Sequence, residues 1–262
     1  MDWNQFDPEG AIRQRYLDID EVTEEINDKI ELTGWDRDEF KNIYDISWIH
    51  HENGLEGVVL AYPEIRSAVD NKIVSDVSLL PTYRDIKAQK TCIDMMRDKA
   101  QARRSNITIK LLTTMHGLLL DDPEKSGTYR KDIPIHRTYF HEIAEPTLIE
   151  TRLSETLDYV NGKKDRDLHP VEFASNVHHR FMRVFPFSKH SGIIGRLLMN
   201  YVLERHGYFP AVIHATDRQR YYEALRGEEP GFREFLCETM ENGLENTLRF
   251  FRQQEKVAAR GA

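Results

Sequence analysis

Apolar residues recur at intervals of three and four along most of this chain, a pattern typical of amphipathic helices. The first run covers residues 8–32, where Ile19, Val22 and Ile26 fall on one helical face and Gly34 marks the end. We expect an interruption of this helix near residues 18–20. The remaining helices are predicted at 36–48, 62–72, 78–102, 107–120, 146–161, 169–184, 193–203, 218–225 and 231–251. The chain is therefore predicted to be mainly α-helical.

Residues 127–140 break this pattern, because apolar side chains there alternate with basic ones. The alternation predicts a short β-hairpin flap, with Ile133 and Ile135 among its apolar positions. Pro134 confines the flap to an edge, where one side of its backbone is open to another extended chain. An ordinary surface hairpin is the alternative.

Composition narrows the class of protein. The chain has 262 residues, 40% of them hydrophobic, and a net charge of −8, which argues against broad nucleic-acid or anionic-membrane binding. Its first residues lack the pattern of a secretory signal, and no apolar run reaches the roughly 18 residues that span a bilayer. Cys92 and Cys237 show no spacing pattern, so we expect reduced cysteines in a soluble, cytoplasmic protein. The predicted division is an N-terminal helical region (1–106), a main domain (107–250) and a frayed C-terminus (251–262).

Residues 50–57 contain two histidines and two glutamates, but no metal site is predicted there. Neighbouring residues on a helix diverge by about 100°, so His50 and His51 do not face a common ion. Glu56, followed by Gly57, would need a cationic partner elsewhere in the chain if it were buried. His116 lies on an apolar helix and is interpreted as a packing histidine.

The most informative stretch is residues 185–196, hereafter the motif segment, which joins two apolar helical runs. Pro186 stops the first helix, while Ser191 and Gly192 are suited to open the second. A short loop that leads into a helix N-terminus presents free N–H groups and a partial positive charge, which suits an anion such as phosphate. A simple helix corner with buried aromatic residues is the alternative.

The region from about 107 to 250 resembles the Fic (Fido) domain family, whose motif is H-P-F-x-D/E-G-N-G-R-x-x-R. The matching residues are Ala174, His178, Pro186, Phe187, Gly192, Arg196, Leu197–Asn200 and Gly207–Pro210. Residues 111–116 and 127–130 resemble the lead-in helix and flap of that family. The resemblance implies a Fic-type helical bundle with the short β-hairpin flap.

The resemblance also assigns roles to residues outside the motif segment. Leu55-Glu56-Gly57 is similar to the end of the family's N-terminal inhibitory helix, although Glu52 stands where that pattern has Ser or Thr. In the family this glutamate pairs with the last arginine of the motif, here Arg196, and blocks productive placement of ATP. Tyr222, Leu225 and Glu229 fall on the nucleotide side of the family's site.

Departures from the family motif fall on its chemical groups. Phe185 replaces the histidine that serves as general base, and phenylalanine cannot accept a proton. Lys189 replaces the acidic Mg²⁺ ligand, His190 and Ser191 replace Gly and Asn, and Ile193 replaces the first arginine. These losses predict that the AMP-transfer chemistry is gone.

Three hypotheses follow. The first is a non-catalytic, regulatory Fic-fold protein that binds a protein partner at the flap. The sequence is also compatible with a homo-oligomer. The second is an enzyme with altered nucleotidyl or phosphate transfer, in which Lys189 supplies the charge of the missing Mg²⁺ and His190 is the base. The third is a sensor that binds ATP or another nucleotide without Mg²⁺, through Lys189, Ser191, Gly192 and Arg196. No cofactor is required by the first hypothesis.

Overall fold

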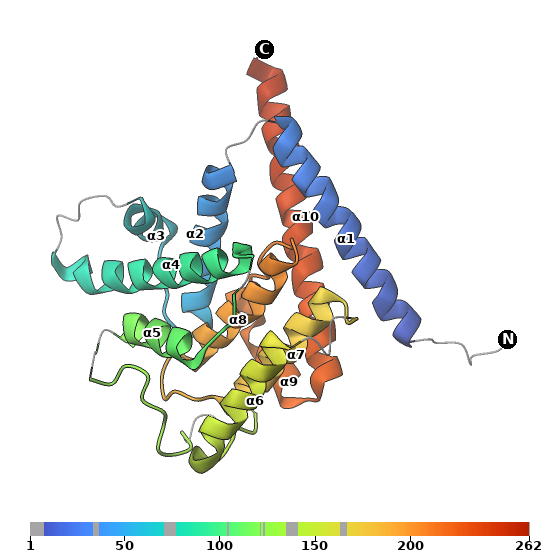
Figure 1. Cartoon of the computed structure of the whole chain (residues 1–262). Helices are drawn as coiled ribbons and strands as arrows, with labels where there is room; N and C mark the ends of the chain where they lie inside the picture. The colour runs from blue at the N-terminus through green and yellow to red at the C-terminus, as the bar shows by residue number, and fades with distance from the viewer. Residues whose placement is uncertain are drawn as a thin grey trace.

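The computed structural model describes residues 8–33, 37–70, 77–103, 105–120, 122, 124–134, 141–162 and 167–261. All regular structure in these ranges is helical. The elements are α1 (Pro8–Thr33), α2 (Arg37–Leu55), α3 (Tyr62–Val69), η1 (Val77–Leu79), α4 (Leu80–Gln101), α5 (Ile109–Leu120), η3 (Pro146–Leu148), α6 (Ile149–Asn161), α7 (Pro170–Val184), α8 (Ser191–Arg205), η4 (Ala215–Asp217), α9 (Arg218–Arg226) and α10 (Glu229–Gly261) (Figure 1).

Helix α8 forms the centre of the bundle. Its sequence from Ser191 to Leu203 contains few polar residues, and every side chain in that span is buried. A helix that is apolar on all sides has to be covered on all sides, and here α7 and α4 pack directly against it while α5 also touches it. Because the motif segment runs into α8, its second half lies at the core of the molecule.

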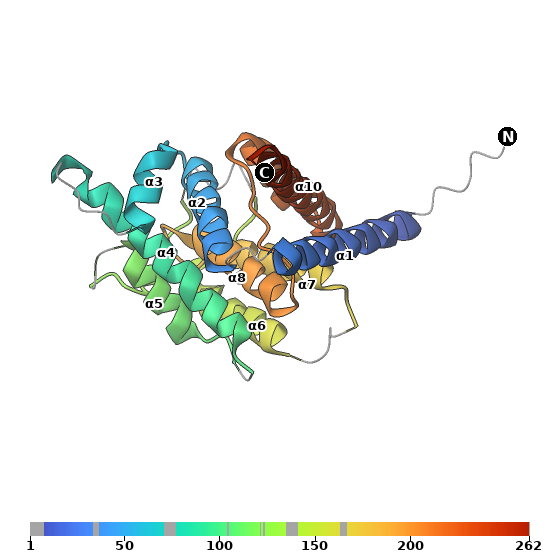
Figure 2. The same cartoon turned by 90° about the horizontal axis from the view of Figure 1, so that it is seen from above.

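The two longest helices, α1 and α10, lie side by side (Figures 1 and 2). Ile12, Ile19 and Ile26 on α1 are buried, which matches the three- and four-residue spacing of the sequence. Arg15 Nε lies 2.6 Å from Glu241 Oε1 and links the two helices. The predicted interruption near residues 18–20 is wrong, because α1 is continuous to Thr33.

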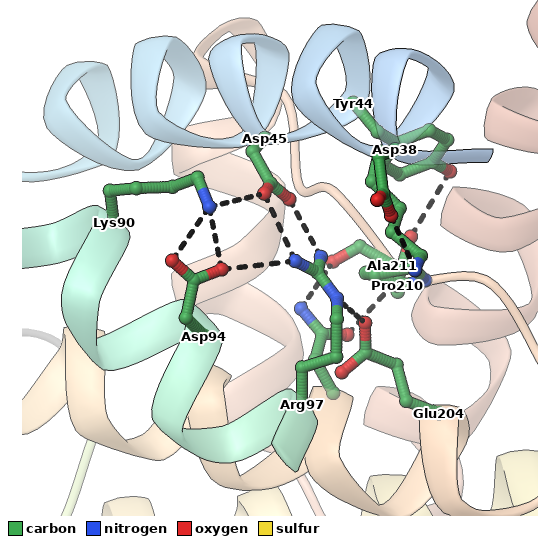
Figure 3. Close-up of polar contacts among 11 residues, drawn as sticks. Asp38, Tyr44, Asp45, Lys90, Asp94, Arg97, Glu204, Pro210 and Ala211 are labelled. Carbon is green, nitrogen blue, oxygen red and sulfur yellow. Dashed lines mark hydrogen bonds and ion pairs between the residues drawn. The ribbon is translucent and has the colours of Figure 1, made fainter. Parts of the chain in front are cut away.

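Helix α2 is held against the core by a partly buried charge network (Figure 3). Arg97 on α4 donates to both carboxylate oxygens of Asp45 on α2, at 3.0 and 2.7 Å, and to Glu204 on α8 at 3.2 Å. Lys90 lies 3.4 Å from Asp45. Burial raises the pKa of Glu204 to about 6, although Arg97 opposes this shift. One guanidinium therefore connects three helices.

The predicted helices are present, with shifted ends. Helix α2 continues to Leu55, well beyond the predicted end at Trp48, and α10 continues past Phe251 to Gly261. The predicted β-hairpin flap is not found, because residues 127–134 form turns and irregular backbone without a strand, and no strand occurs elsewhere in the described ranges. The remainder of the predicted flap, 135–140 with Ile135, lies outside the described residues.

Candidate functional site

The motif segment begins with a left-handed residue that ends α7. Phe185 has φ 44° and ψ 65°, and its N–H donates to the carbonyl of Phe181 at 2.9 Å. This conformation is costly for a residue with a side chain. The surrounding structure fixes it, because the Phe185 ring is only 1% exposed. Phe185, which the sequence predicts to stand in place of a general base, is thus a ring packed into the core.

Arg130, from the predicted flap, fixes the backbone of this turn. It is buried, and its guanidinium donates to the carbonyls of Phe185 at 2.7 Å and Val184 at 3.2 Å, as well as to that of Ala144. Its own N–H donates to the Pro186 carbonyl at 3.0 Å. Carbonyls left free by the end of α7 are satisfied in this way. The segment around Arg130 is therefore attached to the motif segment without a β-ladder.

Phe187 and Ser191 close the other half of the turn. The Ser191 hydroxyl accepts from the Phe187 N–H and donates to the Phe187 carbonyl, both at 2.8 Å. The Phe187 ring stacks on His116 at 4.2 Å between centroids, and His116 Nδ1 accepts the N–H of Gly127. Ser191 was predicted to bind phosphate, but its hydroxyl is occupied by the loop itself. His116 is a buried packing histidine, as its place in the sequence indicates.

Arg196 carries the principal electrostatic feature of the site. Its Nε donates to Glu52 Oε1 at 2.7 Å, and its Nη2 donates to the same oxygen and to Glu56 Oε1, the latter at 2.7 Å. Its Nη1 donates to the Tyr221 hydroxyl at 3.0 Å. Burial disfavours the charge of Arg196, but the two carboxylates outweigh it, so its pKa lies well above the ordinary value. Two carboxylates thus share one buried guanidinium.

Glu56 also lies over the N-terminal turn of α8. A Cβ placed on Gly192 would come within 2.8 Å of Glu56 Oε1 and 3.0 Å of Arg196 Nη1. Only glycine at this position leaves room for the carboxylate and the guanidinium together. The free N–H groups and positive dipole at a helix N-terminus favour an anion. Here the protein's own carboxylate lies beside that position.

Contacts around the C-terminal half of α2 place Glu52 and Glu56. Trp48 Nε1 donates to Glu52 Oε2 at 3.4 Å. The Asn53 and Gln89 side chains exchange two hydrogen bonds, at 2.9 and 3.1 Å, and join α2 to α4. Arg218 donates to the carbonyl of Leu55 at 2.8 Å, at the C-terminal end of α2. Glu56 itself follows directly on that end.

Ile193, predicted to replace the family's first arginine, lies beside residues of α2 and α4. Its side chain borders a cavity of about 10 Å³ together with Trp48, Glu52 and Gln89. A space of this size holds one water molecule at most. Ile193 therefore contributes an apolar side chain, and no charge, to the space beside Glu52.

Lys189 and His190 lie at the surface end of the motif segment. Lys189 is exposed, whereas His190 is half-buried and has φ 61° at the start of α8. Burial lowers the pKa of His190, with Lys189 acting in the same direction and Glu56 opposing it. Two of the residues predicted to bind phosphate, Gly192 and Arg196, therefore lie close to Glu56. A third, Lys189, is exposed to solvent.

The predicted nucleotide side is a packed aromatic region. Tyr222 and Leu225 are buried, and Glu229 lies 3.4 Å from Arg180. The residue that reaches the motif segment is the neighbouring Tyr221, which hydrogen-bonds Arg196 and lies 3.0 Å from His178 Nε2. Burial lowers the pKa of His178 to about 3, which leaves its ring neutral.

Two roles in the site were missed from the sequence: Glu52 as a partner of Arg196, and Arg130 as a donor to the backbone of the motif segment. Glu52 could have been found, because it precedes Glu56 by four residues and so shares its helical face. Nothing in the local sequence distinguished Arg130 from its basic neighbours. In the described part of the chain no cluster of His, Cys, Asp or Glu has the geometry of a metal site, and no helix there has the length and apolar character to cross a bilayer.

Comparison with known proteins points to one family. Residues 106–203 match the Fic/DOC family. The chain is 26% identical over 208 residues to the protein adenylyltransferase Fic of Culex quinquefasciatus, a match that covers 76% of this chain. It spans only about two-fifths of the length of the curated relatives it matches, 41% for this one.

Solved structures share the fold. A Fic domain containing signaling protein from Bacteroides thetaiotaomicron superposes with a TM-score of 0.73 at 22% identity, over 88% of this chain and 98% of that one. Fic-1 from C. elegans superposes with a TM-score of 0.77 at 17% identity, over 94% and 74% of the two chains. Residues 106–203 thus match the Fic/DOC family, and these solved structures share the fold of the chain.

Proposed function

We propose that this chain is a Fic-fold protein that does not transfer AMP and acts instead by binding a protein partner. The observation that carries the proposal is Phe185. It stands at the family's general-base position, its ring is 1% exposed, and it has no atom that accepts a proton. General-base catalysis is typically worth about 10²–10⁴ in rate. The adenylyltransferase activity named for the relatives is therefore not expected here.

The state of Arg196 supports the same proposal. It is the motif's remaining arginine, and Glu52, Glu56 and Tyr221 engage its guanidinium. A triphosphate that approached the N-terminus of α8 would meet the Glu56 carboxylate first, and like charges repel. Two carboxylates on this arginine hold the site closed more firmly than one would.

The partner is proposed to dock along the flap. Its described part, residues 127–134, is attached to the motif segment through Arg130. In the same part Lys131 and Asp132 are exposed, and Ile133 is half-buried against the core. An anchored surface segment of this kind presents exposed side chains to another chain in a fixed position. Loss of catalysis beside a retained scaffold is consistent with such a role, because a fold does not imply an activity.

The test is transfer of label from α-labelled ATP or UTP to the proteins of a lysate and to the chain itself. Wild type, Glu56→Gly and Glu52→Ala/Glu56→Gly should all give no labelled protein. Label that appears in either variant would identify an enzyme held inactive by its own glutamates. Label in the wild type that disappears on mutation of Lys189 or His190 would overturn the proposal outright.

The second candidate is an enzyme with altered nucleotidyl or phosphate transfer. The observation that favours it is the position of His190, half-buried at the start of α8 and close enough to Glu56 for their charges to interact. In this scheme Lys189 replaces the charge of Mg²⁺ and His190 takes the proton. His190→Ala should then abolish turnover, while His190→Gln should leave nucleotide binding in place.

A further inference from the structure

A large concave region lies away from the motif segment, at the other end of α8. It is a cleft of about 1150 Å³ between the C-terminal ends of α4, α6 and α8 and the start of α7. Helix α8 has 15 residues, so its two ends are separated by roughly 20 Å. A ligand in this cleft would not touch Arg196 or Glu56.

The walls of the cleft are held by specific contacts. Asn161 accepts from the N–H of Ile107 and donates to its carbonyl, both at 2.8 Å, which joins α6 to the chain that follows α4. Arg205 Nη1 donates to the carbonyls of Ala100 and Ala102, at 3.3 and 3.1 Å. Hydrogen bonds therefore connect the walls that border the cleft, which favours a site that exists before its ligand arrives.

The charge of the lining is of one sign. Among the described residues that line the cleft, Lys99, Arg103 and Arg205 are charged and no Asp or Glu is present. Within the described ranges none of the three has a carboxylate within ion-pairing distance. The whole chain carries a net charge of −8, so a cleft with three uncompensated cations differs from the rest of the molecule. Such a cleft attracts and concentrates anions.

Neutralisation of helix ends does not account for this charge. A cation near a helix C-terminus is stabilising, and Arg205 bonds carbonyls at the end of α4 in that way. Lys99 already lies in the last turn of α4, and Arg103 follows the helix by two residues. Three helix C-termini border the cleft, but among the described residues Arg205 is the one cation of the three whose side chain bonds helix-end carbonyls. Lys99 and Arg103 therefore remain available to bind a ligand.

We propose that this cleft binds a phosphate-bearing small molecule with a flat or apolar body, of the size of a nucleotide. Lys99 and Arg103 would contact the phosphates, and Arg205 has N–H groups left to join them. Phe173, half-buried, and the edge of Tyr201 would pack against the body of the ligand. Small-molecule sites usually combine an apolar wall with a few polar groups in this way.

Calorimetry with AMP, ADP and inorganic tripolyphosphate, in the presence of EDTA, tests the proposal. Lys99→Gln/Arg103→Gln should weaken ADP binding by roughly tenfold or more, because each lost charged contact is worth about that factor. Lys87→Gln/Lys110→Gln removes the same charge from exposed residues outside the cleft and should leave the affinity within about twofold. Matching thermal unfolding curves would show that both variants are folded.

Three results would overturn the proposal. The first is that the wild type binds none of the probes. The second is equal weakening by both double variants, which would indicate only general attraction to positive charge. The third is an acidic peptide that displaces ADP and binds more tightly, since the cleft would then be a peptide-docking surface. Loss of ADP binding in Lys189→Ala, but not in the cleft variant, would place the nucleotide at the motif segment instead.

Discussion

Glu52 Oε1 accepts hydrogen bonds from both Nε and Nη2 of Arg196, so one carboxylate oxygen binds two nitrogens of one guanidinium. Glu52 is 5% exposed and Arg196 is 2% exposed, whereas Glu56 is 24% exposed. The inner glutamate therefore contributes an ion pair shielded from water, and the outer one contributes a pair that solvent partly screens. Because of this difference in exposure, we expect Glu52 to contribute more to stability than Glu56.

Glu52→Gln should lower the free energy of unfolding by about 2 kcal/mol, because a buried charged hydrogen bond is replaced by a weaker one. Glu56→Gln should lower it by less than about 1 kcal/mol, as is usual for a pair that water screens. Urea denaturation of the two variants beside the wild type measures both values. Equal losses would mean that Glu52 and Glu56 share Arg196 evenly, contrary to the geometry.

Arg130→Lys should destabilise the chain by about 3 kcal/mol. A lysine cannot reproduce the fork that bonds the carbonyls of Phe185, Val184 and Ala144, and each buried carbonyl left without a donor costs about 1–3 kcal/mol. Thermal unfolding measures the loss. Arg84→Lys is the control, because Arg84 is exposed and its guanidinium lies 3.1 Å from the carboxylate of its neighbour Asp85. A similar loss in both variants would contradict the role given to Arg130.

Stability should fall with acidification partly through His116. Burial lowers its pKa to about 4, whereas the unfolded value is near 6.5. Below pH 6.5 the His116 ring of the unfolded chain binds a proton, whereas the ring of the folded chain stays neutral. The free energy of unfolding therefore decreases from pH 6.5 to about 4. His116→Asn keeps an acceptor for the Gly127 N–H and removes the titrating group.

The measurement is the free energy of unfolding against pH for wild type and His116→Asn. The variant should show a shallower decrease between pH 6.5 and 4. Phe187→Leu removes the ring stacked on His116 but keeps the histidine, so it should lower stability at all pH values and retain most of the slope. Parallel curves for wild type and His116→Asn would rule out this contribution.

Gly54→Ala and Gly243→Ala should have opposite effects. A Cβ on Gly54 would lie 2.5 Å from the Cβ of Ala215, so α2 would have to move away from η4. We expect a loss of about 1–3 kcal/mol, as for other overpacked contacts. A Cβ on Gly243 would lie 3.8 Å from the Tyr44 hydroxyl, an ordinary contact, and alanine should add up to about 1 kcal/mol inside α10. Chemical denaturation distinguishes a gain from a loss.

Much of the helical architecture could be predicted from the sequence, because apolar spacing records which face of each helix is buried. Ile12, Ile19 and Ile26 are an example, since their interval of seven places them on one side of α1. Helix ends were predicted less well. The polar run at 50–53 suggested the end of α2, but Glu52 and Asn53 are buried there by partners far along the chain, Arg196 and Gln89.

The flap shows a second limit of local patterns. Alternation of apolar and basic residues from 127 to 140 predicted a hairpin, yet Arg130 turns inward to bond carbonyls at the end of α7. The alternation of apolar and basic residues shows only which side chains are polar and which are apolar. It does not reveal that one arginine of the set bonds to buried backbone instead of water.

The pairing of α1 with α10 has a consequence for the order of folding. Contacts such as Arg15 to Glu241 and Lys29 to Glu255 join segments 226 residues apart. Such contacts form late, because closing a long loop is unfavourable until the intervening chain is compact. During synthesis α7 and α8 can associate as soon as both have emerged, whereas α1 remains without its final partner until α10 is complete. Until then its apolar stripe is a target for chaperones.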